Sequence, residues 1–319
     1  MIIFKNIMSS TITFIYCFDE NYNTQAATSI LSLLRKVNKE IDITIIHKNK
    51  KSFKKYLNII SREKFLQKIK VFDFNLENIA FPNLTNKHIS EATYYRLFID
   101  EVIDCEHSLG KVVYIDSDII CLNNPLNYIN DYFIDLEDGN FLLGAKTDSF
   151  DEKYNFKYFN AGVLIFDYSQ WIQNNIFESL RKILYQKEIN FQYWDQDVLN
   201  YFFKGNYKEI DETLNFEIEI TEDNRNHFIN EKPIFVHYLG NKKPWHVSNL
   251  VYKNTHIYQE VFSNIFDKKY FLLPDTFNLD LYRFFSLYKK EGVKIIFNLS
   301  LVISFFSIFT HHIIKKFLQ

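Results

Sequence analysis

The run YIDSD at residues 114–118 places two carboxylates, Asp116 and Asp118, two positions apart. The apolar, β-branched residues 111–115 predict a strand that leads into this run, and alternate side chains of an extended backbone share one face. Two carboxylates on one face can bind one hard divalent cation and leave coordination positions for phosphate oxygens. A departing diphosphate needs such neutralisation of its charge, so the pattern favours nucleotide-sugar chemistry, although the same spacing is also common in turns.

A second acidic pair, Asp195 and Asp197, lies in WDQD at residues 194–197, directly before an apolar helical pattern. Its structural interpretation is an N-terminal helix cap, because carboxylates stabilise that end of the helix dipole. The sequence leaves a chemical role and a capping role both open.

A third group follows a predicted strand and consists of His237, Gly240 and Lys243. An imidazole added to two carboxylates suits manganese, which accepts oxygen and nitrogen ligands. Gly240 and Lys243 could bring backbone groups and a cation to a diphosphate. A histidine after a strand is also common as a structural residue, and loops use glycine and lysine for ordinary reasons.

Sequence motifs of several other reaction classes are absent. The chain has no G-x-S-x-G, H-E-x-x-H or G-x-G-x-x-G. Residues 139–147 (GNFLLGAKT) resemble a phosphate loop, but Ala145 stands where the lysine should follow the second glycine. We therefore reject this run as a phosphate-binding loop.

Predicted strands and helices alternate along the chain and position these motifs. Hydrophobic patterns predict strands at 11–18, 41–47, 68–74, 111–115, 159–166 and 233–237. They predict helices at 24–37, 51–62, 171–187 and 195–203, and a further helix capped by Ser90. This alternation is typical of an α/β fold with a mostly parallel sheet. Asp116 then lies at the carboxyl end of a strand, the edge where such sheets bind ligands.

Composition narrows the class of protein. The chain has 319 residues, 47% of them hydrophobic and 24% charged, so it can bury a large core and is not disordered. Lys and Arg number 37 against 39 Asp and Glu, and the net charge of -2 gives no reason to expect a nucleic-acid partner. Cys17, Cys105 and Cys121 are widely spaced in apolar runs and fit buried, reduced thiols. The N-terminus lacks a signal-peptide pattern, so we expect a cytoplasmic protein.

The C-terminal segment differs from the rest of the chain. Residues 295–310 carry no charge and are followed by Lys315 and Lys316. At 16 residues the apolar run is shorter than the ~20 needed to span a bilayer, so it predicts an interfacial helix that contacts a membrane surface. A core helix that closes the domain is the alternative.

Taken in order, six motifs resemble those of the retaining glycosyltransferase family 8 over residues 11–246. The motifs are DENY (19–22), HIS (88–90) with TYYRL (93–97), YIDSD (114–118), YFNAGVL (158–164), DQD (195–197), and HYLG (237–240) with KPWH (243–246). Within the family, the chain is most similar to bacterial lipopolysaccharide or lipooligosaccharide α-1,4-galactosyltransferases. The resemblance implies a GT-A fold, Rossmann-like, with a catalytic domain at 1–250, a helical extension at 251–292 and a membrane-associating tail at 293–319.

The resemblance also implies a site for a UDP-sugar. Asp116, Asp118 and His237 would hold Mn²⁺, with Mg²⁺ as the alternative, beneath the diphosphate. Asp19 and Asn21 would contact the uridine. The remaining donor-binding residues would be Arg96, Asn160 and Asp195 at the sugar hydroxyls and Ser117, Gly240 and Lys243 near the diphosphate.

Gln196 would lie under the anomeric carbon, with Asp195 as the second member of the catalytic pair. Because an amide is a poor nucleophile, we expect Gln196 to stabilise oxocarbenium character through its oxygen dipole. By the same resemblance, Asp148, Phe150 and His88 would contact the acceptor.

The implied function is metal-dependent, retaining transfer of a hexose, galactose favoured over glucose, from a UDP-sugar to a saccharide acceptor. The acceptor would be an oligosaccharide or lipid-linked saccharide of lipopolysaccharide or lipooligosaccharide synthesis, at the inner face of the cytoplasmic membrane. One alternative is a haloacid-dehalogenase-like phosphohydrolase that uses Asp116, but three predicted strands precede this residue and Ile119-Ile120 follow the motif. A non-catalytic, membrane-associated saccharide-binding protein would be favoured by a broken metal set, whereas the set is intact in this sequence.

Overall fold

The computed structural model describes residues 11–317 apart from 77–78, 83, 85–89, 104–108, 138–140, 152–154, 187–190, 221–231, 251, 275 and 292–298. Contacts divide the chain into two compact units. The first consists of Met1–Phe216 with Pro233–Val236, and the second of Glu217–Lys232 with His237–Gln319. The three-part division at residues 250 and 292 stays a prediction.

The first unit is built on a seven-stranded sheet with the order β3-β2-β1-β4-β7-β6-β8. Its strands are β1 (Thr13–Phe18), β2 (Ile41–His47), β3 (Leu66–Asp73), β4 (Lys111–Ile115), β6 (Gly144–Asp151), β7 (Phe156–Asp167) and β8 (Lys208–Glu209). β1, β2, β3 and β4 run parallel, as the alternation predicts. β7, however, pairs antiparallel with both β4 and β6, so the sheet is mixed although mostly parallel.

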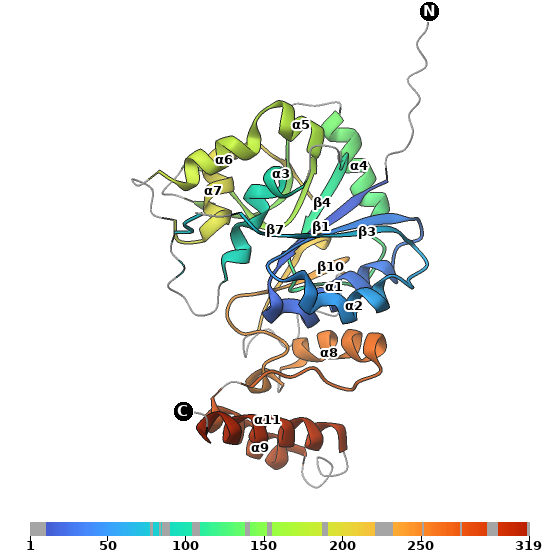
Figure 1. Ribbon diagram of the computed structural model, residues 1–319, viewed down its shortest axis with the longest axis vertical. Coiled ribbons are helices and arrows are strands. Elements are labelled where there is room, and N and C mark those ends of the chain that lie inside the picture. The colour runs from blue at the N-terminus through green and yellow to red at the C-terminus, as the bar shows by residue number, and fades with distance from the viewer. Residues whose placement is uncertain are drawn as a thin grey trace, which may run out of the picture. The chain divides into compact units, whose positions relative to one another are not determined.

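Helices flank the sheet of the first unit on both faces (Figure 1). α1 (Asn23–Leu34) and α2 (Lys54–Ile60) lie on one side. α3 (Ile99–Val102), α5 (Tyr168–Gln173), α6 (Ile176–Leu184) and α7 (Trp194–Phe203) lie on the other. The unit also contains α4 (Leu126–Glu137) and the short 3-10 helices η1 (Glu20–Tyr22), η2 (Lys50–Phe53), η3 (Glu91–Phe98) and η4 (Glu212–Asn215). The α/β prediction is therefore confirmed.

Two predicted helices differ from the structure in form. The helix predicted at 171–187 is two helices, α5 and α6, because Asn175 adopts a left-handed φ of 52° between them. Asparagine tolerates that conformation better than most residues. Ser90 caps its helix as predicted, by accepting a hydrogen bond from the Ala92 backbone N–H, but residues Glu91–Phe98 form a 3-10 helix before α3 begins.

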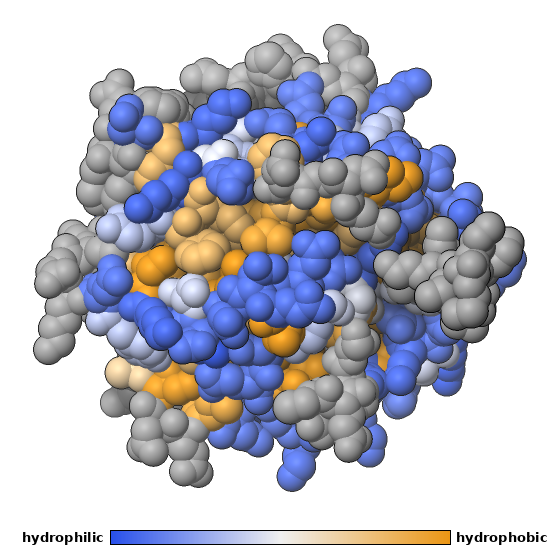
Figure 2. Space-filling view, turned by 90° about the horizontal axis from the view of Figure 1, so that it is seen from above, coloured by the Kyte–Doolittle hydropathy of each residue, from blue (hydrophilic) through white to orange (hydrophobic). Residues whose placement is uncertain are grey.

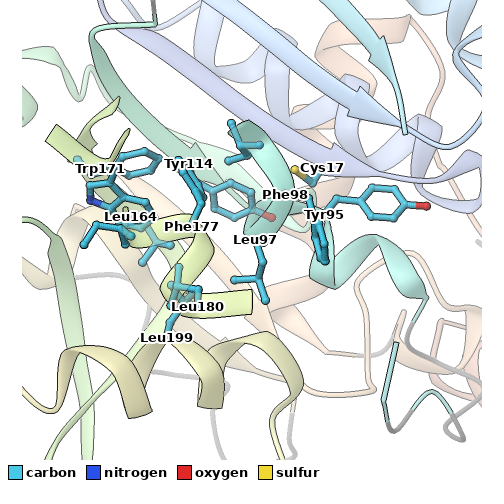
Figure 3. Packing of buried hydrophobic residues seen from close by; sticks show 14 of the residues in the cluster. Cys17, Tyr95, Leu97, Phe98, Tyr114, Leu164, Trp171, Phe177, Leu180 and Leu199 are labelled. Atoms are coloured by element: carbon cyan, nitrogen blue, oxygen red, sulfur yellow. The ribbon is translucent and has the colours of Figure 1, made fainter. Parts of the chain in front are cut away.

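An aromatic core fills the space between the sheet and helices α3, α5, α6 and α7 (Figure 3). Trp171 stacks on Phe166 with ring centroids 4.0 Å apart, and its indole N–H donates to the Leu142 carbonyl at 2.6 Å. Burial of each such side chain contributes about 1.5–3 kcal/mol to the stability of the fold. This core therefore stabilises the arrangement of the sheet and the helices that pack on it. Figure 2 shows the outer face seen from above, where hydrophobic patches lie among mostly hydrophilic residues.

Cys17 and Cys121 are buried free thiols, as predicted, and Cys105 lies outside the described residues. Burial raises the pKa of both thiols, which keeps them protonated and unreactive. They act as small apolar side chains in the core.

A second sheet has three strands in the order β5-β10-β9. Its strands are β5 (Ile119–Cys121), β9 (Phe216–Glu219) and β10 (Phe235–Leu239). β10 corresponds to the strand predicted at 233–237. Its first two residues belong to the first unit, and His237 follows them by one peptide bond.

The second unit continues with helices η7 (Val247–Asn249), α8 (Lys253–Phe266), α9 (Phe277–Glu291) and α11 (Leu299–Phe317). Phe305 and Ile308 of α11 pack on Val247 and Leu250. Within the described residues, no helix is long and apolar enough to cross a membrane.

Candidate active site

A shift in register between β6 and β7 creates the centre of the candidate site. Ala145 of β6 lies opposite Leu164, but its neighbour Lys146 lies opposite Asn160. Residues 161–163 of β7 therefore bulge away from the β6 ladder. Their backbone groups are buried and need hydrogen-bond partners from elsewhere.

Side chains and a neighbouring strand end supply those partners. The Ala161 N–H donates to Oε1 of Gln196 at 2.9 Å, and the Ala161 carbonyl accepts from Nη1 of Arg96 at 2.5 Å. The Gly162 carbonyl accepts from the backbone N–H of Asp116 at 2.9 Å. The bulge thus brings together Gln196, Arg96 and Asp116, three predicted site residues from distant parts of the sequence.

Asn160 closes the bulge from within the same strand. Its Oδ1 accepts from the Gly162 N–H at 2.8 Å and from Nδ2 of Asn215 at 3.0 Å. Its oxygen is therefore occupied by the protein, which leaves the amide nitrogen as the atom with which Asn160 could contact a ligand.

Arg96 lies buried between two carboxylates. Its Nη2 is 2.7 Å from Oδ1 of Asp116, and its Nε is 2.8 Å from Oδ2 of Asp195. Its guanidinium carbon lies 4.0 Å from the centroid of the Tyr114 ring. Burial alone would lower the pKa of Arg96, but the two carboxylates outweigh burial and raise this pKa. The guanidinium is therefore a fixed positive charge.

Asp195 is buried at the first turn of α7. Burial raises its pKa to about 6, while Arg96 and a hydrogen bond from the Thr93 hydroxyl favour the charged form. Asp195 does not cap the helix, so that interpretation is wrong for this residue. Asp197 does not cap α7 either, because its Oδ2 accepts from the backbone N–H groups of Gln192 at 2.6 Å and Tyr193 at 2.8 Å, which both precede the helix.

The predicted metal ligands converge at the end of β4. Asp116 and Asp118 follow β4 directly, and His237 comes from β10. One ligand atom from each of Asp116, Asp118 and His237 lies within 4.8 Å of the others. Two carboxylates and an imidazole are a donor set that fits Mn²⁺, so the residues present fit the expected cation.

Ser117, between the two carboxylates, is buried and its hydroxyl has no hydrogen-bond partner in the described part of the chain. A buried hydroxyl without a partner is destabilising. This is consistent with a group whose partner arrives with a ligand.

The residues predicted to contact uridine lie at the same edge of the sheet. Asp19 follows β1, which is the parallel neighbour of β4, so Asp19 and Asp116 both follow carboxyl ends of adjacent strands. Oδ1 of Asp19 accepts from the Asn21 N–H at 2.9 Å and caps η1, and Asn21 is exposed. The η1 turn therefore leaves Asn21 exposed at this edge of the sheet.

The remaining predicted residues lie in other environments. In the second unit, Gly240 is exposed with φ of 68°, and Nζ of Lys243 donates to the Tyr238 carbonyl at 2.5 Å. Asp148 is exposed on β6. Phe150 lies in β6 but its side chain is outside the described residues, as is the whole of His88.

Two tyrosines at the site were missed by the sequence reasoning. The Tyr114 hydroxyl donates to Oδ1 of Asp116 at 2.7 Å, and the Tyr158 hydroxyl donates to Oδ1 of Asp197 at 2.5 Å. Tyr114 could have been found, because it precedes Asp116 by two positions in a predicted strand and so shares its face. Nothing in the sequence pattern links Tyr158 to Asp197.

Comparison with known proteins supplies the family. Residues 13–249 match the family described as glycosyl transferase family 8. The chain belongs to glycosyl transferase family 8. It is therefore a family 8 hexosyltransferase, and the phosphohydrolase and non-catalytic binding alternatives are rejected.

Relatives of this family 8 enzyme include lipopolysaccharide transferases. A lipopolysaccharide 1,2-glucosyltransferase of Escherichia coli is 29% identical, with 72% of this chain and 71% of that protein covered. A lipopolysaccharide 1,3-galactosyltransferase of Salmonella typhimurium is 26% identical, with 51% of each covered. The solved galactosyltransferase LgtC, in complex with donor and acceptor sugar analogues, has a TM-score of 0.65 and 25% identity, and the match covers 79% of this chain and 95% of LgtC. The family 8 chain therefore has the GT-A-like fold that the motifs predicted.

Proposed function

We propose that this enzyme transfers galactose, with glucose as the alternative, from a UDP-sugar to a saccharide acceptor of lipopolysaccharide or lipooligosaccharide synthesis. The observation that carries the proposal is the convergence of Asp116, Asp118 and His237 within 4.8 Å at a ligand-binding edge of the sheet. The names of its relatives in Escherichia coli and Salmonella typhimurium support the acceptor class, and they include both glucosyl and galactosyl donors.

The metal set is proposed to bind Mn²⁺, with Mg²⁺ as the alternative. A bound divalent cation would offset the negative charge that develops on the UDP diphosphate as the glycosidic bond breaks. On the protein's side, Arg96 and Tyr114 both donate to Oδ1 of Asp116. These two donors orient the Asp116 carboxylate through Oδ1, and Oδ2 is the oxygen that would bind the cation.

The remaining donor contacts are proposals for binding and orientation. Asp19 and Asn21 would hold the uridine, while Ser117, Gly240 and Lys243 would hold the diphosphate. Arg96, Asn160 and Asp195 would hold the sugar hydroxyls. A guanidinium has five N–H donors, and Arg96 uses one on each nitrogen for the protein, namely to the carbonyls of Thr93 and Ala161 and to Asp116, so two remain for the sugar.

Gln196 is proposed to stabilise the oxocarbenium-like sugar from below. Its oxygen has two lone pairs, and one is used by the Ala161 N–H. The other can direct the negative end of the amide dipole at the anomeric carbon. The acceptor, bound near Asp148, Phe150 and His88, would then attack on the face of the departing diphosphate, which gives an α-linked product from an α-linked donor.

The C-terminal helices are proposed to bind the inner face of the cytoplasmic membrane. Phe305 and Ile308 of α11 pack inward, whereas Phe306 is 70% exposed on the same helix and Tyr282 is 65% exposed on α9. Further exposed apolar residues on these helices are Phe285, Tyr288, Ile303, Ile313 and Ile314. Lys315 and Lys316 in the last turn of α11 add positive charge that complements anionic lipid headgroups.

A panel of UDP-sugars, each with and without Mn²⁺, tests the proposed activity by the release of UDP. We expect Mn²⁺-dependent release from UDP-galactose, or from UDP-glucose, and the loss of this release in Asp118→Asn with the fold intact by circular dichroism. Near-normal turnover of Asp118→Asn would refute the metal role. A β-linked product by NMR would refute retention.

A further inference from the structure

We propose that Tyr158 is a positioning residue that fixes the orientation of the Gln196 amide, acting with Asp197. The inference rests on the proposed role of Gln196 beneath the anomeric carbon. It concerns a contact that the motifs do not predict, because Tyr158 and Gln196 are 38 residues apart in the sequence.

The first constraint on Gln196 comes from the bulge in β7. The backbone N–H of Ala161 is a donor and cannot accept a hydrogen bond. The Gln196 atom 2.9 Å from this nitrogen must therefore be the amide oxygen, Oε1. The nitrogen, Nε2, then points the other way and lies 3.3 Å from the Tyr158 hydroxyl oxygen. Nε2 can only donate, so the Tyr158 oxygen accepts this bond.

The second constraint fixes the proton of Tyr158. Its hydroxyl lies 2.5 Å from Oδ1 of Asp197, and an ionised carboxylate can only accept. The Tyr158 proton is therefore directed at Asp197, which leaves the hydroxyl lone pairs for Gln196. The chain of bonds has one polarity throughout, from the Gln196 amide to Tyr158 to the Asp197 carboxylate.

Asp197 is itself fixed by the backbone. Its Oδ2 accepts from the N–H groups of Gln192 and Tyr193, directly before α7. Trp194, the first residue of α7, has φ of 48°, a conformation that costs an L residue about 1–3 kcal/mol. The two backbone bonds to Oδ2 hold Asp197 in place next to this strained turn. We therefore expect the Asp197 carboxylate to keep its position when the Tyr158 hydroxyl is removed.

The helix that carries Gln196 is clamped to the same strand. Oδ1 of Asn200 accepts from the Phe159 N–H, and Nδ2 of Asn200 donates to the Phe159 carbonyl, each at 2.8 Å. Tyr158 and Gln196 are thus held at a fixed separation by the backbone. The rotation of the Gln196 amide is restrained at its oxygen by the Ala161 N–H and at its nitrogen by the Tyr158 hydroxyl.

Orientation matters because the two ends of an amide have opposite polarity. The oxygen end stabilises a developing positive charge, whereas the N–H end would destabilise it. Without the Tyr158 hydroxyl, Gln196 would sample rotamers in which Oε1 leaves its place. In the proposed site the nucleotide is held by other residues than Gln196, so we expect kcat to fall and KM to stay close to the wild-type value.

Tyr158→Phe tests the proposal with the aromatic ring retained. We expect kcat for UDP release from UDP-galactose or UDP-glucose to fall on the order of tenfold, with KM within about twofold of the wild type. Asp197→Asn is less suitable, because Asp197 also holds the turn before α7. Tyr16→Phe is the matched control, since it removes another buried hydroxyl of the same unit, one that contacts Ser29 of α1.

A double-mutant cycle separates positioning from a general structural effect. If Tyr158 acts through Gln196, adding Tyr158→Phe to Gln196→Ala causes no further fall in kcat. A further fall equal to that of the single variant, or a tenfold fall in Tyr16→Phe, would overturn the inference and leave the proposed function standing. Near-normal kcat of Gln196→Ala alone would overturn the proposed role of Gln196 and the inference with it.

Discussion

The hydroxyl of Tyr114 donates a 2.7 Å hydrogen bond to Oδ1 of Asp116, two residues further along the chain. The extended backbone puts both side chains on one face, so this contact is local and needs no other element to form it. Arg96 donates to the same oxygen from η3, at 2.7 Å. Two donors on one oxygen fix the carboxylate plane.

Loss of the Tyr114 hydroxyl should therefore weaken metal binding. In Tyr114→Phe we expect the affinity for Mn²⁺ to fall about tenfold, because outer partners of metal ligands typically affect affinity by about 10–100-fold. Electron paramagnetic resonance of free Mn²⁺ in a titration measures this without any sugar. An affinity equal to that of the wild type would contradict the second-sphere role of Tyr114.

Removal of the Arg96 side chain should destabilise the fold as well as the site. Arg96→Ala leaves the buried carboxylate of Asp195 without its cation, and we expect a loss of about 3–5 kcal/mol in the free energy of unfolding. Arg62→Ala, at an exposed position, is the control and should change it by less than about 0.5 kcal/mol. Urea unfolding measures both. Adding Asp195→Asn to Arg96→Ala should restore part of the lost free energy of unfolding, because it removes the unpaired negative charge. If the double variant is no more stable than Arg96→Ala, the charge of Asp195 is not the cause of the loss.

The stability of the fold should depend on pH through His47. This ring is fully buried, and burial lowers its pKa although Glu20 and Asp19 oppose the shift. Nδ1 accepts from the Asn49 N–H at 2.7 Å, so the neutral ring carries its proton on Nε2 and donates to Oδ1 of Asn23 at 2.8 Å. The neutral form is therefore the one that the fold stabilises.

The sign of the dependence follows from the lowered pKa. The stabilisation is complete above the ordinary histidine pKa of about 6.5 and is lost as pH falls from there through the folded-state pKa, because the unfolded chain takes up the proton first. Urea unfolding at several values between about pH 8 and 5 should show a shallower decline for His47→Gln than for the wild type. Parallel declines would exclude His47 as the titrating group.

The exposed apolar face of α9 and α11 should govern lipid binding. We expect Ile303→Ser with Phe306→Ser to reduce binding to anionic vesicles more than tenfold in flotation, since each buried apolar side chain contributes about 1.5–3 kcal/mol. Ser307→Gln, an exposed polar replacement on the same helix, is the control. A chain truncated before residue 295 should leave the membrane fraction yet turn over a detached oligosaccharide. Loss of turnover in a folded truncation would contradict a purely attaching role.

Much of the framework could be predicted from local pattern. The strands around residues 13–18, 41–47 and 111–115 are short apolar runs with helices between them, and parallel pairing follows from that order. The position of the proposed metal ligands Asp116 and Asp118 was predictable for the same reason, since they follow such a strand. Sequence order does not predict the antiparallel insertion of β7 beside β4, because that pairing depends on contacts between distant segments.

The hydrogen bonds that hold the site residues in place were harder to predict than the proposed metal ligands. The bulge at Ala161 depends on the register of β7 against β6, and no residue type in YFNAGVL predicts it. Asp195 and Asp197 look equivalent in WDQD, yet one pairs with Arg96 and the other holds a turn and Tyr158. The difference arises from which side of α7 faces the sheet, and this is a tertiary property.

The two carboxylates around Arg96 also bear on how the chain is made. A ribosome that adds about 5–20 residues per second releases Asp195 roughly 5–20 s after Arg96. Until then the Arg96 guanidinium has Asp116 but not Asp195 as an ion-pair partner, so nascent chains that end before α7 lack the buried Arg96–Asp195 pair. Folding of the first unit should therefore be completed late in translation, and emerging chains that still expose β4 and β7 are natural clients for chaperones.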